Sequence, residues 1–144
     1  ERGDVLLVKR RYEPLAGQWS LPGGALGVGE TLQAGTAREI LEETGLVVLV
    51  GVVVDVFDRI LVDDEGVRFH FVLVDYLCIP VGGTLAAESD VVDARWVPVA
   101  DLRRYGVAAK AVDVILRARA MAAGSAGASG SVDVAGPSLS GPVD

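Results

Sequence analysis

The sequence predicts one compact domain of the α/β class. Its 144 residues suit a single domain and leave little room for a second one. Hydrophobic residues make up 51% of the chain and charged residues 23%, so the chain can bury a core. Runs of β-branched residues alternate with segments of helical periodicity, and this alternation predicts both strands and helices.

The first third of the chain predicts a strand, a loop and a helix. Residues 5–9 are largely apolar and are expected to form a buried strand. Residues 10–30 hold two prolines and five glycines, which is typical of a loop. Helical periodicity begins after Thr31, a suitable N-cap residue, and ends at Gly45, a suitable C-terminal cap.

The middle of the chain predicts a β-hairpin. Residues 46–57 are apolar and β-branched, and they form either one strand or two strands broken around Gly51. The acidic run at residues 63–66 predicts a turn, and residues 67–79 predict a second long strand. The adjacent glycines at 82–83 then turn the chain again.

The last third predicts a short strand at residues 95–99 and a closing helix at residues 108–121. The inward residues of this helix are expected to be Val112, Ile115 and Leu116. The composition changes after Ala122 and loses its amphipathic period. We therefore expect a folded domain over residues 1–122 and a flexible tail, rich in Gly, Ser and Ala, over residues 123–144.

The charge and hydropathy of the chain limit its partners. The net charge is −7, whereas a general nucleic-acid binder needs a basic face, so no nucleic-acid partner is expected. An acidic protein that handles phosphate esters repels its substrate unless cations lie between its carboxylates and the phosphates. The longest apolar stretch, residues 46–54, is far shorter than the roughly 20 residues that span a bilayer, so no membrane partner is expected.

Cysteine content and the N-terminal residue give two further expectations. Cys78 is the only cysteine, so no internal disulfide can form and the cytoplasm is the default location. The chain begins at Glu1 rather than at a methionine, and an apolar run follows almost at once. We therefore expect an upstream segment, such as a first strand, to be missing.

One face of the predicted first helix is acidic. Projection at about 100° per residue gives an expected inward face of Ala37, Ile40, Leu41 and Thr44. The opposite side holds three carboxylates within one turn, those of Glu39, Glu42 and Glu43. Leu32 lies outside the inward arc.

Two interpretations of this acidic face are open. It is either a solvated surface with an Arg38–Glu42 pair or a site for cations. Glu39 and Glu43 are like charges at neighbouring helical positions, and their repulsion costs roughly 0.2–0.5 kcal/mol when exposed. The three glutamates also lie toward the C-terminal end of the helix, where the macrodipole disfavours negative charge. Mg²⁺, which prefers oxygen ligands, would offset this repulsion.

The loop before the helix supports a cation or phosphate site. Residues 19–24 have the sequence Trp-Ser-Leu-Pro-Gly-Gly, in which a rigid proline precedes two glycines. Two glycines let the main chain approach a metal or a phosphate where a Cβ would clash. Taken alone, this segment is equally compatible with an ordinary turn.

Together these residues resemble the Nudix box. The chain runs from Gly24 through five residues to Glu30, then through seven residues to Arg-Glu-Ile-Leu-Glu-Glu-Thr-Gly-Leu at residues 38–46. Flanking segments also resemble MutT-like members, at residues 5–8, 17–24, 69–77 and 95–98. The resemblance covers about residues 4–120, and it implies an α/β/α sandwich with a mixed, curved sheet.

The resemblance also implies an activity and a set of roles. Nudix hydrolases cleave a nucleoside diphosphate linked to another group, using Mg²⁺ or Mn²⁺ and water. Carried over by position, the metal ligands would be Glu39, Glu42, Glu43 and the carbonyl of Gly23. Arg38 would orient one of these carboxylates rather than touch substrate. Glu30 would assist from the junction of loop and helix.

The general base is not fixed by the resemblance. Glu39 is one candidate, because it belongs to the box. In such families the base also comes from a loop outside the box, and here that loop would supply Glu88 or Asp90. The alternative for both loop residues is an ordinary surface position.

Four other residues have two interpretations each. Arg10 binds phosphate or is an ordinary charge at the end of a strand, and Trp19 stacks on a base or anchors the loop. His70, the only histidine, is expected to be partly buried or on the substrate side rather than catalytic. Cys78 lies in an apolar strand, where inert packing is expected.

The implied substrate is a nucleoside triphosphate, including an oxidised one, that would yield a monophosphate and pyrophosphate. ADP-ribose or a sugar nucleotide is the alternative, although the proline that many ADP-ribose enzymes have is missing near residues 60–62. A nucleotide-sensing module without turnover is the alternative of another class. Such modules usually lose box glutamates, and all of them remain here. Many relatives are homodimers, which makes a homodimer one expected assembly.

Overall fold

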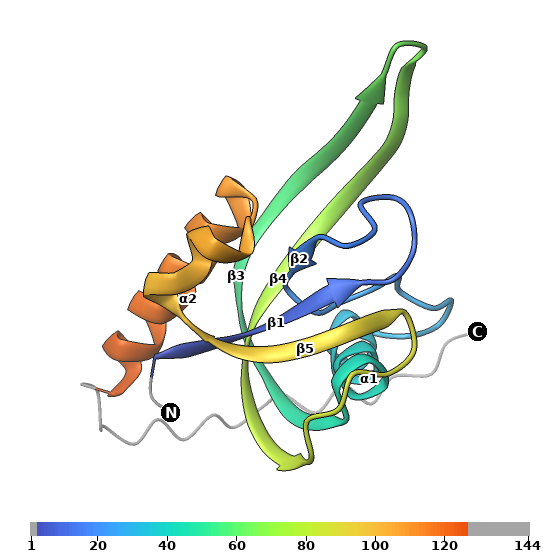
Figure 1. The fold of residues 1–144 in the computed structure, drawn as a ribbon. Coiled ribbons are helices and arrows are strands. Elements are labelled where there is room, and N and C mark those ends of the chain that lie inside the picture. Colours follow the sequence, from blue (N-terminus) through green and yellow to red (C-terminus); the bar gives the residue numbers. More distant parts are fainter. Residues whose placement is uncertain (1–2, 127–144) are drawn as a thin grey trace.

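The computed structural model describes residues 3–126, which fold into two helices, five strands and a 3₁₀ segment (Figure 1). In chain order the elements are β1 (Asp4–Arg10), β2 (Trp19–Ser20), α1 (Leu32–Thr44), β3 (Leu46–Asp63), β4 (Gly66–Gly83), β5 (Val91–Pro98), η1 (Val99–Tyr105) and α2 (Ala109–Ala126).

The strands form two antiparallel sheets. One sheet has three strands in the order β2-β1-β5, and the other is the β3–β4 hairpin. Figure 1 shows α1 and α2 on opposite sides of this hairpin, which confirms the α/β class with a helix layer on each side. The expected mixed sheet differs in detail, because every strand pair within residues 3–126 is antiparallel: both neighbours of β1 run against it.

The core lies where β1, β5, η1 and α2 meet. Its buried residues are Leu7, Val97, Leu102 and Ile115. On α2 the predicted inward face is partly wrong, because Leu116 is 48% exposed and Val114 is 3% exposed. The covered face of α2 therefore centres on Val114 and Ile115 rather than on Ile115 and Leu116.

The limits of α1 are the ones that the sequence predicts. Thr31 is the N-cap, and its hydroxyl oxygen accepts a hydrogen bond from the backbone N–H of Ala34 at 3.1 Å. Gly45 ends the helix in the left-handed region, with a φ of 70°. A Cβ on Gly45 would also approach the carbonyl oxygen of Thr84, so glycine meets two requirements there.

Several other elements are longer than the sequence predicts. β3 runs through Gly51 as one strand, and the register shifts between Val50 and Val53. The short strand β2 lies inside the segment that was expected to be loop, since two residues there pair with β1. β5 begins at Val91 rather than at residue 95. α2 continues to Ala126, four residues beyond the predicted domain limit, and residues 127–144 of the predicted tail lie outside the described residues.

Among residues 3–126, no helix is long and apolar enough to cross a bilayer.

Candidate active site

A polar cavity of about 330 Å³ lies between the last turns of α1, the glycine loop and the end of β1. Residues from four separate segments line it, among them Arg10, Gly23, Gly24, Glu39, Glu43 and Asp90. A second cavity of similar volume lies between the two sheets, but its lining is mainly apolar and lacks the box glutamates. The polar cavity is therefore the place where phosphate chemistry could occur.

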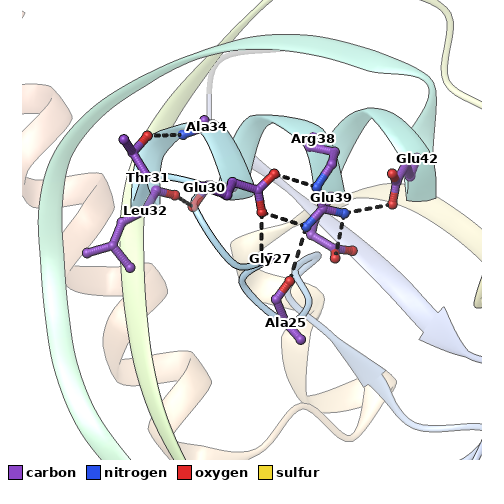
Figure 2. Close-up of polar contacts among 10 residues, drawn as sticks. Ala25, Gly27, Glu30, Thr31, Leu32, Ala34, Arg38, Glu39 and Glu42 are labelled. Carbon is purple, nitrogen blue, oxygen red and sulfur yellow. Dashed lines mark hydrogen bonds and ion pairs between the residues drawn. The ribbon is translucent and has the colours of Figure 1, made fainter.

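Arg38 joins three of the predicted site carboxylates. It makes a two-point contact with Glu30, from Nε at 2.7 Å and from Nη2 at 2.9 Å (Figure 2). Its Nη1 donates to Glu39 and to Glu42, both at 3.0 Å, and its Nη2 also donates to the carbonyl of Ala25 at 3.1 Å. The Arg38–Glu42 pair of the surface interpretation exists, yet it is one part of a larger network that fixes two box carboxylates.

This network sets the charge state of its members. Hydrogen bonds from Arg38 and from the backbone of Gly27 lower the pKa of Glu30 to about 2. The hydrogen bonds from Arg38 to Glu30, Glu39 and Glu42 raise the pKa of Arg38 above its already high usual value. Both groups are therefore charged at neutral pH, and the two-point geometry of an arginine–carboxylate pair holds the guanidinium plane in one orientation.

Glu43 is the buried acid of the site. It is 8% exposed, and its Oε2 accepts a hydrogen bond from the backbone N–H of Gly23 at 3.0 Å. Burial raises the pKa of Glu43 to about 7, with help from the nearby charges of Glu39 and Asp90, while Gly23 and Arg10 oppose the rise. A charged Glu43 is thus costly in the absence of a further cation.

The burial of Glu43 corrects the predicted helix face. Glu43 was expected on the outward side and Leu41 on the inward side, but Leu41 is 48% exposed. The projection gave the angles between these residues correctly and did not reveal what covers them. The glycine loop folds back over the last turns of α1, so the side that holds Glu43 is covered by the backbone at Gly23.

The two glycines of the loop are needed for this close approach. A Cβ on Gly24 would overlap the carboxylate of Glu39. Gly23 has a φ of 156°, a backbone conformation that residues with a side chain rarely adopt, and its N–H donates to Glu43. The missing side chain at Gly24 therefore lets the loop backbone lie directly against Glu39, while the approach of this loop to a metal or a phosphate stays a prediction.

The donor set fits a hard divalent cation. The acids on this side of α1 range from buried to half-exposed, with side-chain exposures of 17% for Glu39 and 48% for Glu42. Within residues 3–126, no three acidic, histidine or cysteine side chains converge as a cage. Arg38 donates to oxygens of Glu39 and Glu42. Oxygen ligands around a buried carboxylate are the chemistry that Mg²⁺ prefers.

The loop that contains the two outside acids docks on the end of α1. Ala86 donates to the carbonyl of Thr44 at 2.9 Å, and the backbone of Glu88 donates to the carbonyl of Glu43 at 3.1 Å. Asp90 lines the polar cavity, whereas the exposed side chain of Glu88 does not. Of the two candidates, the structure therefore brings Asp90 to the site.

The two predicted substrate contacts have different positions. Arg10 lines the polar cavity, and its Nε donates to the carbonyl of Pro14 at 2.9 Å. Trp19 packs against the core instead, edge-on to Tyr105 at a centroid distance of 5.1 Å. The guanidinium of Arg95 lies 5.4 Å from its ring centroid. Trp19 thus anchors the loop and does not line the cavity.

His70 and Cys78 lie away from the polar cavity. His70 is exposed on the hairpin, so the expectation that it is partly buried or on the substrate side is wrong; its Nε2 lies 2.8 Å from Asp58. Cys78 is half-buried, and burial raises the pKa of its thiol, in agreement with inert packing. The sequence interpretation missed Tyr12, which lines the cavity with Val8 and Arg10. Their spacing of two residues, typical of extended chain, was the available signal.

Fold and site together define an α/β protein with a carboxylate-lined cavity beneath a glycine loop. The family comparison agrees with this class, because the family model described as NUDIX domain matches residues 1–118. The chain belongs to the Nudix family.

This chain aligns with only part of the length of each named relative. The ADP-ribose pyrophosphatase of Methanocaldococcus jannaschii is 35% identical over 92 residues, which is 64% of this chain and 53% of that protein. The 8-oxo-dGDP phosphatase of Mus musculus is 31% identical over 102 residues, which is 68% of this chain and 29% of that protein. The chain thus spans about half of the first relative and less than a third of the second.

A solved structure supports the fold over most of both chains. The MutT Nudix hydrolase from Burkholderia pseudomallei aligns with a TM-score of 0.70 and 26% identity. The alignment covers 81% of this chain and 89% of that one.

Proposed function

We propose that the protein is a hydrolase that requires a divalent cation and cleaves the diphosphate linkage of a nucleoside diphosphate derivative. The observation that carries this proposal is Glu43, a carboxylate that is 8% exposed and lines a polar cavity together with Glu39 and Arg10. Ionising a carboxylate that is buried there costs free energy unless a cation binds beside it. Membership of the Nudix family supports the same activity.

The proposed cation ligands are Glu39, Glu42, Glu43 and the carbonyl of Gly23. Mg²⁺ is the proposed ion, with Mn²⁺ as an alternative of similar ligand preference. When bound, the ion would neutralise charge on the phosphates and make water a better nucleophile near neutral pH. Arg38 would keep the carboxylates of Glu39 and Glu42 in place, and Glu30 would in turn hold Arg38.

The remaining residues of the cavity have proposed roles in binding and proton transfer. Arg10 would bind a phosphate of the substrate, and Tyr12 at the rim offers an aromatic ring to the nucleoside. Glu39 or Asp90 would accept the proton of the attacking water, because both carboxylates line the cavity. Glu88 remains a candidate for this role only if the loop moves its exposed side chain inward.

The proposed substrate is a nucleoside triphosphate, including an oxidised one, with a monophosphate and pyrophosphate as products. The similarity to an 8-oxo-dGDP phosphatase supports an oxidised nucleotide as substrate. ADP-ribose or a sugar nucleotide is the second candidate, which the similarity to an ADP-ribose pyrophosphatase favours. The reducing cytoplasm is the proposed location, which a single cysteine permits.

A module that senses a nucleotide without turnover is the competing class. It needs a binding cavity but no cation site, so it gives no reason to keep Glu39, Glu42 and Glu43 on one side of α1. The presence of all three supports turnover.

The test is hydrolysis of a nucleotide panel in the presence of Mg²⁺, Mn²⁺ or EDTA. The panel contains nucleoside triphosphates, 8-oxo-dGTP, ADP-ribose and sugar nucleotides, and the products are identified by chromatography. Release of a nucleoside monophosphate that EDTA abolishes is the expected result. Tight binding of a nucleotide with no turnover in either metal would favour the sensing module instead.

A further inference from the structure

The segment between β4 and β5 is attached to two of the elements that border the polar cavity. At its first attachment, the backbone N–H groups of Ala86 and Glu88 donate to the last two carbonyls of α1. At its second attachment, the backbone N–H of Arg11 donates to the carbonyl of Asp90 at 2.9 Å. The guanidinium of Arg11 also donates to the carbonyl of Val91, from Nη2 at 3.3 Å. The segment therefore links the end of α1 to the end of β1.

Between these two attachments the chain reverses in a four-residue turn. The N–H of Val91 donates to the carbonyl of Glu88 at 3.2 Å and closes the turn. The first central residue is Ser89, whose φ is 56°. Turns with a positive φ at this position are mirror images of the common type I and type II turns. The turn at residues 88–91 therefore has the opposite hand to an ordinary one.

The left-handed conformation is unusual for serine. Glycine adopts a positive φ without steric cost, and asparagine tolerates it, whereas a β-branched residue rarely adopts it. Within residues 3–126, Ser89 and Leu15 are the residues other than glycine that have a positive φ. Such a residue persists where its surroundings fix it, and these residues cluster at functional sites. Here the backbone bonds on both sides of the turn fix Ser89.

The turn separates two acids that differ in their relation to the polar cavity. Glu88 and Asp90 flank Ser89, and both are exposed. Asp90 lines the cavity with Glu39 and Glu43, whereas Glu88 does not. The negative charge of Asp90 is also one of the causes that raise the pKa of Glu43, so the two carboxyl groups lie within electrostatic reach. The hand of the turn thus coincides with the choice of the acid that reaches the cavity.

We propose that Ser89 is a positioning residue of the hydrolase, and that its left-handed backbone directs the carboxylate of Asp90, rather than that of Glu88, into the polar cavity. This role belongs to the backbone conformation of Ser89 and not to its hydroxyl group. The inference rests on the proposed function in so far as it gives Asp90 a part in hydrolysis. The placement of Asp90 by Ser89 does not depend on turnover.

Asp90 is the better placed of the two proposed proton acceptors. Glu39 accepts a hydrogen bond from Arg38 at 3.0 Å and is a proposed ligand of the cation, so its lone pairs are partly used. In the step itself, the oxygen of water bonds to phosphorus while the bond from phosphorus to the bridging oxygen breaks. The electron pair of the broken bond leaves with the departing phosphate. The proton that the water loses goes to the carboxylate of Asp90.

The test compares substitutions of Ser89 by kcat and KM, with Mg²⁺ and with 8-oxo-dGTP and ADP-ribose as probes. Ser89→Gly and Ser89→Asn allow a positive φ and are expected to keep kcat within a factor of about two. Ser89→Val disfavours it and is expected to lower kcat by about 10-fold, with little change in KM, because a proton acceptor acts in the transition state. Asp90→Asn is expected to lower kcat by about 100-fold.

A double-mutant cycle separates positioning from a general structural effect. When Ser89→Val is added to Asp90→Asn, kcat is expected to fall no further, because the carboxylate that Ser89 positions is gone. A further fall of about 10-fold would overturn the proposal. The matched control is Ser125→Val, the same substitution at an exposed position of α2, which is expected to leave kcat unchanged. Ser89→Thr is a milder β-branched change that replaces Ser89→Val if circular dichroism shows that the latter does not fold.

Crystal structures of Ser89→Val and Ser89→Gly give a readout that needs no turnover. The carboxylate of Asp90 is expected to leave the cavity in Ser89→Val and to stay there in Ser89→Gly. An Asp90 carboxylate that stays in the cavity of Ser89→Val would overturn the proposal, even if kcat falls. A wild type that hydrolyses neither probe would count against the proposed function, and the two crystal structures would still decide whether Ser89 places Asp90.

Discussion

The last turns of α1 and the outer hairpin depart from the usual distribution of polar and apolar residues in opposite directions. On α1 the acid Glu43 is 8% exposed while Leu41 is 48% exposed. On the hairpin the apolar side chains of Phe69 and Phe71 face outward. Each departure has a free-energy cost for the isolated chain. The two costs would be offset in different ways: a cation would offset the cost of the buried acid, and an apolar surface would offset the cost of the exposed rings.

The largest expected effect on activity comes from removing the negative charge of glutamates on α1. Glu43→Gln and Glu42→Gln are each expected to lower kcat/KM by about 10³-fold or more, because the amide is a poor ligand for Mg²⁺. Isothermal titration with Mg²⁺ gives a second readout, in which affinity falls in parallel. Glu65→Gln, at an 82% exposed position on the hairpin turn, is the matched control.

Full activity in Glu42→Gln and Glu43→Gln would remove the metal-site assignment. Unchanged circular dichroism is needed alongside, so that loss of activity is not mistaken for loss of the fold.

Arg38 should have the next largest effect, since it organises carboxylates without lining the cavity. Arg38→Lys keeps the charge but cannot contact Glu30, Glu39 and Glu42 with one planar group. We expect about a 10- to 100-fold fall in kcat and a similar fall in Mg²⁺ affinity, as for other residues that orient metal ligands. Arg68→Lys, in the surface pairs with Asp63 and Glu65, should leave both quantities unchanged.

A normal Mg²⁺ affinity in Arg38→Lys, with a reduced kcat, would indicate instead that Arg38 acts on substrate.

Gly24→Ala is expected to have a smaller effect. Its Cβ would overlap the Glu39 carboxylate, so either the loop or that side chain must move. We expect roughly a 10-fold loss in kcat/KM from the displaced ligand. Gly124→Ala on α2 is the control, because a Cβ there has nothing within 4 Å. Equal activity in the two variants would show that the close approach at Gly24 is not required.

The sequence determines the local parts of this site better than the parts that depend on distant contacts. The N-cap Thr31, the C-terminal Gly45 and the spacing of the glutamates follow from residues within one helix and its ends. The burial of Glu43 depends on a loop twenty residues earlier that folds back to donate from Gly23. No helical projection contains that information.

Similar reasons explain the other differences. The choice between Glu88 and Asp90 depends on how residues 86–90 dock on α1, through backbone bonds to Thr44 and Glu43. Trp19 could serve a base or a core equally well by its chemistry, and the packing against Tyr105 decides between them. The sequence underpredicts the length of the hairpin strands, because they continue through Gly51 and toward Gly83 and glycines usually interrupt strands.

The smallest and most specific prediction concerns the stability of the metal-free chain as a function of pH. The pKa of Glu43 is raised from 4.5 to about 7 in the folded chain. Its contribution to stability is therefore fully present below pH 4.5 and is lost as the pH rises through about 7, by roughly 3 kcal/mol at most. Glu30 has the opposite sign, with a pKa lowered to about 2, so its contribution is lost in a separate window as the pH falls below 4.5.

The measurement is the Tm of the wild type and of Glu43→Gln in EDTA between pH 5 and pH 8. The wild-type Tm should fall relative to the variant by roughly 5–10 °C over this range, because only the wild type must charge a buried acid. Adding Mg²⁺ at pH 8 should restore much of the wild-type Tm and little of the variant's, since the ion binds the charged form. Parallel curves for the two proteins would mean that Glu43 is charged at no cost. The burial of this acid would then no longer contrast with the exposure of the hairpin rings.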